Sequence, residues 1–444
     1  MKCDDVYKLN LNENQFRLDY QMKVKENIDW SNHDFSVYVE SHEETTELID
    51  KISEKFSVGR DNIYLTNGID ECLIAIAFGI YRLKGRIAIT ECTYSGFEIA
   101  LSYVAGIWGE EISDKICWIS VDNLDTNIDR VLEQIKGQEI SAFYSCNPHN
   151  PIGSVWTGGL KRFLDYTRAQ NIIVICDEAY AEYAENDDES MGFISLIDYS
   201  KEYTNVGVTR TFSKAYGLAG LRCGYFISYN EFLLSNIAQY HKAMPYSVNC
   251  VAYELGLQII DNNSYLKQMI RQTKENRDFL LRKLNSVGLK SYPSITNFVL
   301  VETKGFTDEL IQLLKDKNVM VKNASDFGIA NHIRITVGRI EQMKKTISVI
   351  KDFLKNNNLN KEIKQMSNNL IEELKEVVMS ISKSKQELND DTNLCLDLGF
   401  DSVEMIELFS EVEDKYDIEF DFDGVDFEDI AVFKNFVSYV EKNM

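Results

Sequence analysis

One lysine among small and hydroxyl-bearing residues gives the sequence its strongest chemical signal. It lies in the segment 209–225, TRTFSKAYGLAGLRCGY, where Lys214 follows Thr211 and Ser213 and Arg222 comes eight residues later. Hydroxyl groups donate hydrogen bonds to anions, and an arginine grips an anion with its planar guanidinium group. A lysine beside such an anion site can link covalently to an aldehyde cofactor while its neighbours hold the cofactor's phosphate. An isolated Ser-Lys pair is more often a surface dipeptide, so the interpretation depends on the rest of the chain.

Two polar segments that follow apolar runs carry side chains suited to the same cofactor. The segment CNPHNPIG (146–153) holds two of the chain's four prolines, and its Asn-Pro pairs predict a rigid turn after a strand. The segment DEAYAEY (177–183) follows the run IIVIC, which places Asp177 at a strand end. A carboxylate there can pair with a pyridinium nitrogen and make the ring an electron sink. Without Lys214 downstream, a solvated helix cap would be the better interpretation.

An alternation of short apolar runs with amphipathic stretches, from about 62 to 228, predicts the sheet that positions these residues. Such runs indicate a mostly parallel sheet with helices on both faces, whose ligands bind beyond the carboxyl ends of the strands. A helix opened by TNGIDE (66–71) would add backbone N–H groups of Gly68, Ile69 and Asp70 as phosphate ligands. The expected strands are RIAIT (86–90), ICWIS (116–120), ISAFYS (140–145), IIVIC (172–176), TNVGVT (204–209) and CGYFIS (223–228).

Together these motifs resemble the fold-type I pyridoxal-phosphate (PLP) aminotransferases, most closely the histidinol-phosphate aminotransferases and their phosphothreonine-decarboxylase relatives. The resemblance covers roughly residues 5–355. It implies an α/β PLP-transferase fold over 1–354, with a large domain built on a mostly parallel seven-stranded sheet and a small α+β lobe. We expect the large lobe at about 40–285 and the small lobe from about 1–39 and 286–354.

The resemblance also implies a role for each motif residue. Lys214 would bind the cofactor covalently and act as the catalytic base and acid, Asp177 would face the ring nitrogen, and Tyr94 would stack on the ring. Substrate anions would be bound by Arg334 and Lys322, and Asn12 would lie in an arm that closes over the substrate. Other cofactor contacts would come from Gly68, Ile69, Asp70, Thr211, Ser213 and Arg222, from Tyr38 of the other subunit, and from Asn150 and Tyr180 at the phenolic oxygen.

This chain departs from the family pattern at three of these places. Gln15 and His149 stand where relatives have proline and often asparagine, and Lys322 where many have arginine. Two cations facing an open site, Lys322 and Arg334, would suit a carboxylate or a phosphate substrate. Lysine lacks the bidentate fork of arginine, which argues against phosphate specificity at Lys322.

The C-terminal part differs in composition from the rest. Residues 361–444 contain 22 acidic and 8 basic residues, so they carry −14 of the net charge of −23. A polar segment, 355–362, predicts a linker, and 363–444 a separate acidic module. Within it the spacing of residues 403, 406, 409, 412 and 416 predicts a helix with one apolar face.

The segment LGFDS (398–402) stands at the start of that helix. Asp401 and Ser402 fit an N-cap, which alone would explain any Asp-Ser pair in this place. In its acidic, helical surroundings the segment resembles acyl and peptidyl carrier proteins, which implies an all-α four-helix domain whose Ser402 carries 4′-phosphopantetheine. A phosphodiester would gain there from the positive end of the helix. Whether an acyl or an aminoacyl group is carried stays open.

The composition argues against several other classes of protein. A net charge of −23 argues against nucleic-acid binding, and the longest apolar run is too short to span a bilayer. The N-terminus lacks the features of a signal peptide. Nine cysteines without paired spacing predict a reducing cytoplasm and argue against a disulfide framework or a metal site.

The combination predicts a PLP-dependent transaminase with a fused carrier domain, acting on a small acidic or carrier-tethered substrate in a specialised biosynthetic pathway. Expected partners are a second copy in a homodimer, a small-molecule amino donor, a keto or acyl substrate, a phosphopantetheinyl transferase and pathway enzymes that dock the carrier. Two alternatives stay open: an amino-acid decarboxylase or oxidase of the same fold, and an inactive scaffold that docks the carrier. The intact set of cofactor residues argues against the scaffold.

Overall fold

A computed structural model describes the chain over residues 6–16, 46–185, 191–245, 248–356, 359–382, 384, 386, 388–420 and 427–444. The chain divides into two compact units, Met1–Phe353 and Leu354–Met444, and each is described by itself. In the described part, no helix combines the length and the apolarity needed to cross a membrane.

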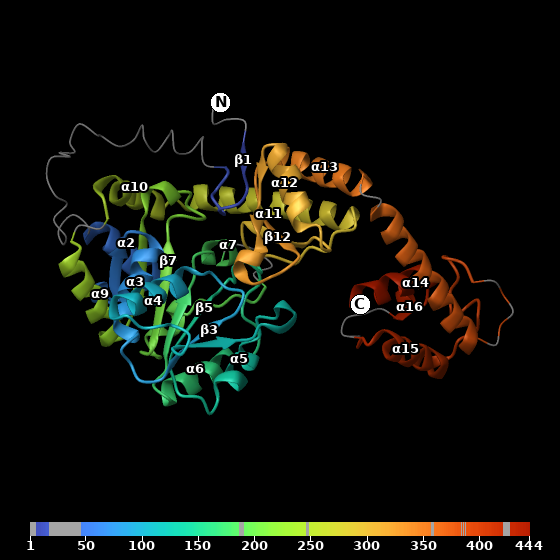
Figure 1. Cartoon of the computed structure of the whole chain (residues 1–444), viewed down its shortest axis with the longest axis horizontal. Helices are drawn as coiled ribbons and strands as arrows, with labels where there is room; N and C mark the ends of the chain where they lie inside the picture. Colours follow the sequence, from blue (N-terminus) through green and yellow to red (C-terminus); the bar gives the residue numbers. More distant parts are fainter. Residues whose placement is uncertain are drawn as a thin grey trace. The chain divides into compact units, whose positions relative to one another are not determined.

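Buried apolar strands form a seven-stranded sheet at the centre of the first unit (Figure 1). The spatial order is β2-β8-β7-β6-β5-β3-β4; β8 runs antiparallel to β2 and β7, and the other neighbouring pairs are parallel. The predicted mostly parallel sheet is therefore confirmed. The strands are β2 (Ile63–Thr66), β3 (Arg86–Thr90), β4 (Ile116–Ile119), β5 (Ile140–Cys146), β6 (Ile173–Asp177), β7 (Val206–Thr211) and β8 (Gly224–Ser228).

Helices cover this sheet, and every residue of β5 to β8 is buried. One group of helices packs through α3 on β7 and β8, and another contacts β4 and β6. The first group is α3 (Gly68–Ile80), α4 (Gly96–Trp108) and α9 (Glu231–Ala243), and the second is α5 (Ile128–Ile135) and α6 (Leu160–Ala169). The remaining helices of the large lobe are α2 (Thr46–Phe56), α7 (Ala181–Glu185), α8 (Ile197–Ser200), α10 (Cys250–Ile260) and α11 (Asn263–Ser286).

The small lobe is built on a three-stranded antiparallel sheet of order β11-β12-β9. The N-terminal strand β1 pairs in parallel with β10, which brings residues 9–14 to the lobe. Its elements are β1 (Tyr7–Lys8), β9 (Phe298–Glu302), α12 (Thr307–Asp316), β10 (Val319–Met320), β11 (Lys322–Asn323), η6 (Ala324–Phe327), β12 (His332–Thr336) and α13 (Ile340–Asn356).

The second unit is helical, as expected of a carrier domain. Its described helices are α14 (Leu359–Ile381), α15 (Ser402–Tyr416), α16 (Phe427–Ile430) and α17 (Phe433–Asn443). They enclose a small core that includes Leu374, Val378, Leu408, Val412 and Phe436. Helices α13 and α14 occupy the two ends of segment 355–362, and its assignment as a linker stays a prediction.

The apolar face of α15 differs from the predicted one. Val403 and Ile406 are 70% and 68% exposed, whereas Met405, Leu408 and Val412 are buried. The expected face over 403, 406, 409, 412 and 416 was therefore wrong in its first two positions. Two apolar stripes share the helical period in this segment, and the core selects the second.

Candidate active site and carrier site

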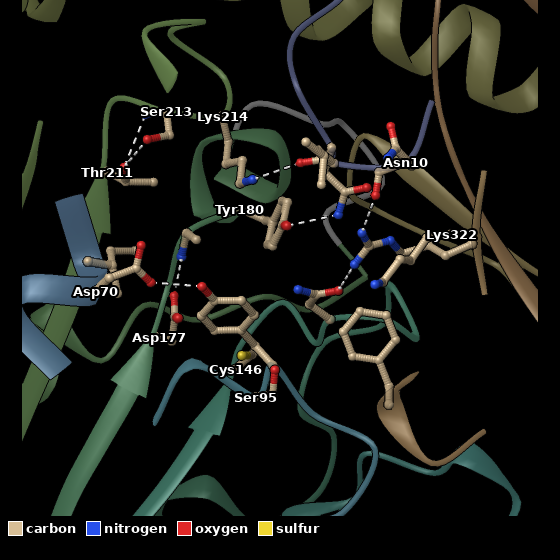
Figure 2. Close-up of a pocket in the computed structure, with 18 of the residues that line it drawn as sticks. Asn10, Asp70, Ser95, Cys146, Asp177, Tyr180, Thr211, Ser213, Lys214 and Lys322 are labelled. Atoms are coloured by element: carbon tan, nitrogen blue, oxygen red, sulfur yellow. Dashed lines mark hydrogen bonds between the residues drawn. The ribbon is translucent and has the colours of Figure 1, made fainter. Parts of the chain in front are cut away.

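A cavity of about 310 Å³ lies at the carboxyl ends of β6 and β7 (Figure 2). Because parallel strands end at the same edge of a sheet, Asp177 and Thr211 meet there although they are distant in sequence. Most of the residues named from the sequence line this cavity: Asn12, Ile69, Asp70, Tyr94, Asn150, Asp177, Tyr180, Thr211, Ser213, Lys214, Arg222, Lys322 and Arg334. Gly68 adjoins it through Arg222, Ser402 belongs to the second unit, and Tyr38 falls outside the described residues.

Lys214 points into the cavity and carries an amine that is easily neutralised (Figure 2). Its Nζ donates a hydrogen bond to the carbonyl of Leu11 at 3.3 Å and lies 5.6 Å from the centre of the Tyr180 ring. Burial, and then the nearby Arg334 cation, lower the pKa of Lys214 to about 8. A lysine of this kind has a substantial neutral fraction near physiological pH, which is the form that attacks an aldehyde or accepts a proton.

Asp177 is a buried carboxylate on the floor of the cavity, only 4% exposed. One oxygen accepts the backbone N–H of Ala179 at 3.0 Å, and the other accepts the hydroxyl of Tyr144 at 3.3 Å. Burial raises the pKa of Asp177 to about 6. A buried carboxylate is stabilised by a nearby positive charge, so this site suits a protonated ring nitrogen.

The loop before α3 and Arg222 form a close-fitting anion cradle. Gly68 has a φ of 75°, which other residues rarely adopt, and a Cβ atom there would lie 2.4 Å from Nη2 of Arg222, so a larger residue would strain the backbone and displace this guanidinium. Nη2 of Arg222 pairs with Asp70 at 2.6 Å, and Tyr94 donates its hydroxyl to Asp70 at 2.7 Å. The guanidinium of Arg222 has further N–H groups, and α3 is long enough for its free backbone N–H groups to favour an anion. These residues therefore fit the phosphate of the expected cofactor.

The two hydroxyl residues before Lys214 are linked to each other. Thr211 Oγ1 lies 2.9 Å from Ser213 Oγ and accepts the backbone N–H of Ser213 at 3.0 Å. It also lies 3.2 Å from the carbonyl of Cys223. This arrangement fixes the turn from β7 to Lys214.

Arg334 on β12 is a buried cation that makes no ion pair within the described part of the chain. Its Nη1 donates to Asn150 Oδ1 at 2.6 Å, and its Nη2 donates to the carbonyl of Asn10 at 2.9 Å. The guanidinium lies 5.0 Å from the ring centre of Phe327 and 5.3 Å from that of Phe298. A buried cation with only neutral partners favours an anionic ligand.

Lys322 is less free than Arg334. Its Nζ pairs with Asp326 at 2.5 Å, so an acidic partner already offsets its charge. Of the two cations expected to bind the substrate, Arg334 is therefore the better placed.

The arm residue Asn12 reaches Tyr180. Its Nδ2 donates to the phenolic oxygen of Tyr180 at 2.9 Å, while its Oδ1 accepts the hydroxyl of Thr336 at 3.1 Å. Because Tyr180 accepts this bond, its own hydrogen is left to be donated elsewhere. Sequence reasoning had named Asn12 as a substrate contact only.

Six further residues line the cavity that were not named as site residues from the sequence: Asn10, Leu11, Ser95, Cys146, Ala179 and Phe327. Asn10 and Phe327 both contact Arg334, Asn10 from a segment 324 residues away and Phe327 from the turn just before β12. The sequence could have indicated these two residues only by their positions: Asn10 directly precedes the motif LNENQF, and Phe327 lies shortly before the strand HIRITVG.

In the second unit, Ser402 is the first residue of α15 and is exposed. Asp401 caps the helix: its carboxylate accepts the N–H groups of Val403 and Glu404, and Glu404 accepts the N–H of Asp401. The capping box fixes the backbone around Ser402 and leaves its hydroxyl at the positive end of a 15-residue helix. Such a position suits a hydroxyl that is to carry a phosphodiester.

Comparisons with known proteins find a family model for each of the two parts of the chain. Residues 6–350 match the family model of aminotransferase class I and II, and residues 372–440 match that of the phosphopantetheine attachment site. A histidinol-phosphate aminotransferase of Carboxydothermus hydrogenoformans is 30% identical over 310 residues, which cover 69% of this chain and 81% of the relative.

Two solved structures share the fold of the first unit. The histidinol-phosphate aminotransferase of Sinorhizobium meliloti in complex with pyridoxal-5′-phosphate has a TM-score of 0.63 at 21% identity, covering 79% of this chain and 91% of that one. The L-threonine-O-3-phosphate decarboxylase of Porphyromonas gingivalis has a TM-score of 0.64 at 23% identity, covering 79% of this chain and 100% of that one. Taken with the family matches, these findings show that the chain belongs to the class I and II aminotransferases, as a PLP-dependent transaminase with a phosphopantetheine-carrying domain at its C-terminal end.

Proposed function

We propose that the protein moves an amino group between a donor amino acid and a carbonyl compound that bears a carboxylate or a phosphate. The observation that carries this is the placement of Lys214 and Arg334 in one cavity, a neutralisable amine and a buried guanidinium with neutral partners. Bound pyridoxal phosphate supplies the aldehyde that takes up the amino group and the ring that accepts electrons.

Substrate binding, proton transfer and contacts to the cofactor ring are assigned to different residues of the cavity. Arg334 binds the anionic group of the substrate and so fixes the position of its Cα. Lys214 Nζ removes the proton from that Cα and returns a proton during amino transfer. Asp177 keeps the ring nitrogen protonated, and Asn150 and Tyr180 donate to the phenolic oxygen. In support, the hydrogen bond from Asn12 leaves the hydrogen of Tyr180 free to point into the cavity.

Cofactor contacts complete the assignment. Gly68, Ile69 and Asp70 hold the phosphate through backbone N–H groups, assisted by Ser213, Thr211 and Arg222. Tyr94 stacks on the ring. A homodimer in which Tyr38 reaches the phosphate of the other subunit, and a location in the cytoplasm, are part of the same proposal.

The carrier domain sets the chemical context of the substrate. We propose that Ser402 is esterified by 4′-phosphopantetheine, and that an acyl or aminoacyl thioester on this arm is the substrate or the product of the pathway. A tethered substrate reaches an effective concentration of about the millimolar range, which favours weakly bound substrates. The exposed acidic groups of α15 suit basic partner enzymes.

The covalent capture of pyridoxal phosphate by cofactor-free protein should rise with pH around the pKa of Lys214. Raising the pH through about 8 converts the ammonium to the neutral amine, which alone attacks the aldehyde. We expect half-maximal capture, trapped with borohydride after short mixing times, near pH 8. A half-maximum near the ordinary lysine value of 10.5 would contradict the proposed environment of Lys214.

The reaction type has a direct test. Incubated with glutamate and a keto-acid acceptor, the holoenzyme should form 2-oxoglutarate and the new amine in equal amounts. Release of carbon dioxide from the amino acid would instead support the decarboxylase alternative, and ammonia with oxygen uptake would support the oxidase. Loss of 2-oxoglutarate formation in Arg334→Gln, with cofactor retained, would identify the substrate anchor.

A further inference from the structure

Tyr144 on β5 contacts the acid at the centre of the site although no motif includes it. Strand β5 lies beside β6 with Cys146 in register with Asp177, and Tyr144 stands two residues earlier on the same face. Its hydroxyl lies 3.3 Å from Oδ2 of Asp177. Both side chains are buried, and Tyr144 is 0% exposed.

The contact is the last step of a chain of neutral groups. Thr93 donates its hydroxyl to Cys146 Sγ at 3.5 Å, and Cys146 Sγ lies 3.8 Å from the hydroxyl of Tyr144. Burial raises the pKa of the Cys146 thiol to about 12 and the pKa of Tyr144 well above its ordinary value. Both groups therefore stay protonated, so Tyr144 always has a hydrogen to donate to Asp177.

This donor decides how Asp177 is held. Its first oxygen accepts the N–H of Ala179 and its second accepts the hydroxyl of Tyr144, so the carboxylate is fixed from both sides. Burial disfavours the ionised form of Asp177, and a hydrogen bond to the carboxylate opposes that effect. The ring of Tyr144 packs against Phe97, with centres 4.5 Å apart, so the hydroxyl has little freedom to turn away.

We propose that Tyr144 is a positioning residue for the reaction, and that its hydroxyl keeps Asp177 ionised and oriented towards the ring nitrogen of the cofactor. The inference rests on the role proposed above for Asp177. It adds a residue that touches neither substrate nor cofactor and acts only through the carboxylate.

Tyr144→Phe removes only the hydroxyl and keeps the ring. We expect kcat to fall about tenfold with KM changed less than twofold, because one hydrogen bond to a charged group is lost. The acidic limb of the kcat profile should move up by about half to one pH unit, since Asp177 then takes up a proton more readily. Cofactor-free variant protein, titrated with pyridoxal phosphate, should bind it several-fold more weakly.

Tyr183→Phe is the matched control. Tyr183 is equally buried, and its hydroxyl has no hydrogen-bond partner among the described residues. Its kcat, acidic limb and cofactor affinity should equal those of the wild type. Equal effects in the two variants would overturn the proposal, as would a Tyr144→Phe enzyme that matches the wild type in all three measurements.

Two further variants, Asp177→Asn and the double variant with Tyr144→Phe, distinguish a failure of this inference from a failure of the proposed role of Asp177. Asp177→Asn should lose most activity, and adding Tyr144→Phe to it should cost nothing more. If Asp177→Asn is fully active, the role of Asp177 fails; if it is inactive while Tyr144→Phe is normal, only the present inference fails.

Should Tyr144→Phe not fold, 3,5-difluorotyrosine at position 144 keeps the shape of the side chain and makes its hydroxyl a stronger hydrogen-bond donor. It should shift the acidic limb downwards, and no shift or an upward shift would overturn the proposal.

Discussion

Replacing Lys214 with alanine is expected to lower kcat by about three orders of magnitude or more, because both the covalent link to the cofactor and the mobile proton are lost. The variant should still bind pyridoxal phosphate through the cradle of Gly68 and Arg222, but borohydride should no longer attach the cofactor covalently to the protein. Since the variant lacks only an amine, a small primary amine in solution should restore part of the rate. Steady-state kinetics and the intact mass of the borohydride-reduced, denatured protein check these results.

Lys115 provides the control for this variant. Burial lowers the pKa of Lys115 as well, but it lies outside the cavity and donates to the carbonyls of Leu83 and Gly85. Lys115→Met should therefore still retain the cofactor covalently after reduction and keep the wild-type kcat, whatever its thermal stability. A Lys214→Ala enzyme with more than a tenth of the wild-type kcat would contradict the account.

The second large effect concerns the carrier domain. Incubation with coenzyme A and a broad-specificity phosphopantetheinyl transferase should raise the intact mass of the protein by one phosphopantetheine group. Ser402→Ala should abolish this increase completely, because the proposed phosphodiester is formed with the hydroxyl of Ser402, the first residue of α15. The capping box of Asp401 and Glu404 does not use the Ser402 side chain, so the helix should keep its stability.

Ser438→Ala is the matched control, since Ser438 is an exposed serine on α17 whose hydroxyl contacts only its own helix. It should be modified like the wild type. Modification of Ser402→Ala at any other residue would contradict the assignment. With modified protein, mass analysis after exposure to candidate acyl or aminoacyl donors then shows which group the arm carries.

The strands could be predicted from the sequence because buried parallel strands are continuous apolar runs. The run ISAFYS corresponds to β5 and IIVIC to β6, and from there the meeting of Asp177 and Lys214 follows from the geometry of a parallel sheet. The resemblance to a family then named the partners that sit on loops. Apolar runs, the common edge of a parallel sheet and the family resemblance together predicted most of the residues that line the cavity.

Contacts between residues of unrelated segments could not be predicted in this way. In the sequence, Tyr144 is an ordinary strand residue. Its contact with Asp177 depends on the pairing of β5 with β6, which brings its hydroxyl to the carboxylate. The engagement of Lys322 by Asp326 likewise depends on the turn at η6. In α15, periodicity allowed two apolar faces, and only packing shows that Val403 and Ile406 are exposed.

Peptide mapping of the borohydride-reduced holoenzyme tests the central claim most directly. After reduction and proteolysis, mass spectrometry should find the reduced cofactor on a single lysine, in the peptide that contains Lys214. Attachment at Lys322 or at a surface lysine, or no covalent cofactor after reduction, would contradict the account.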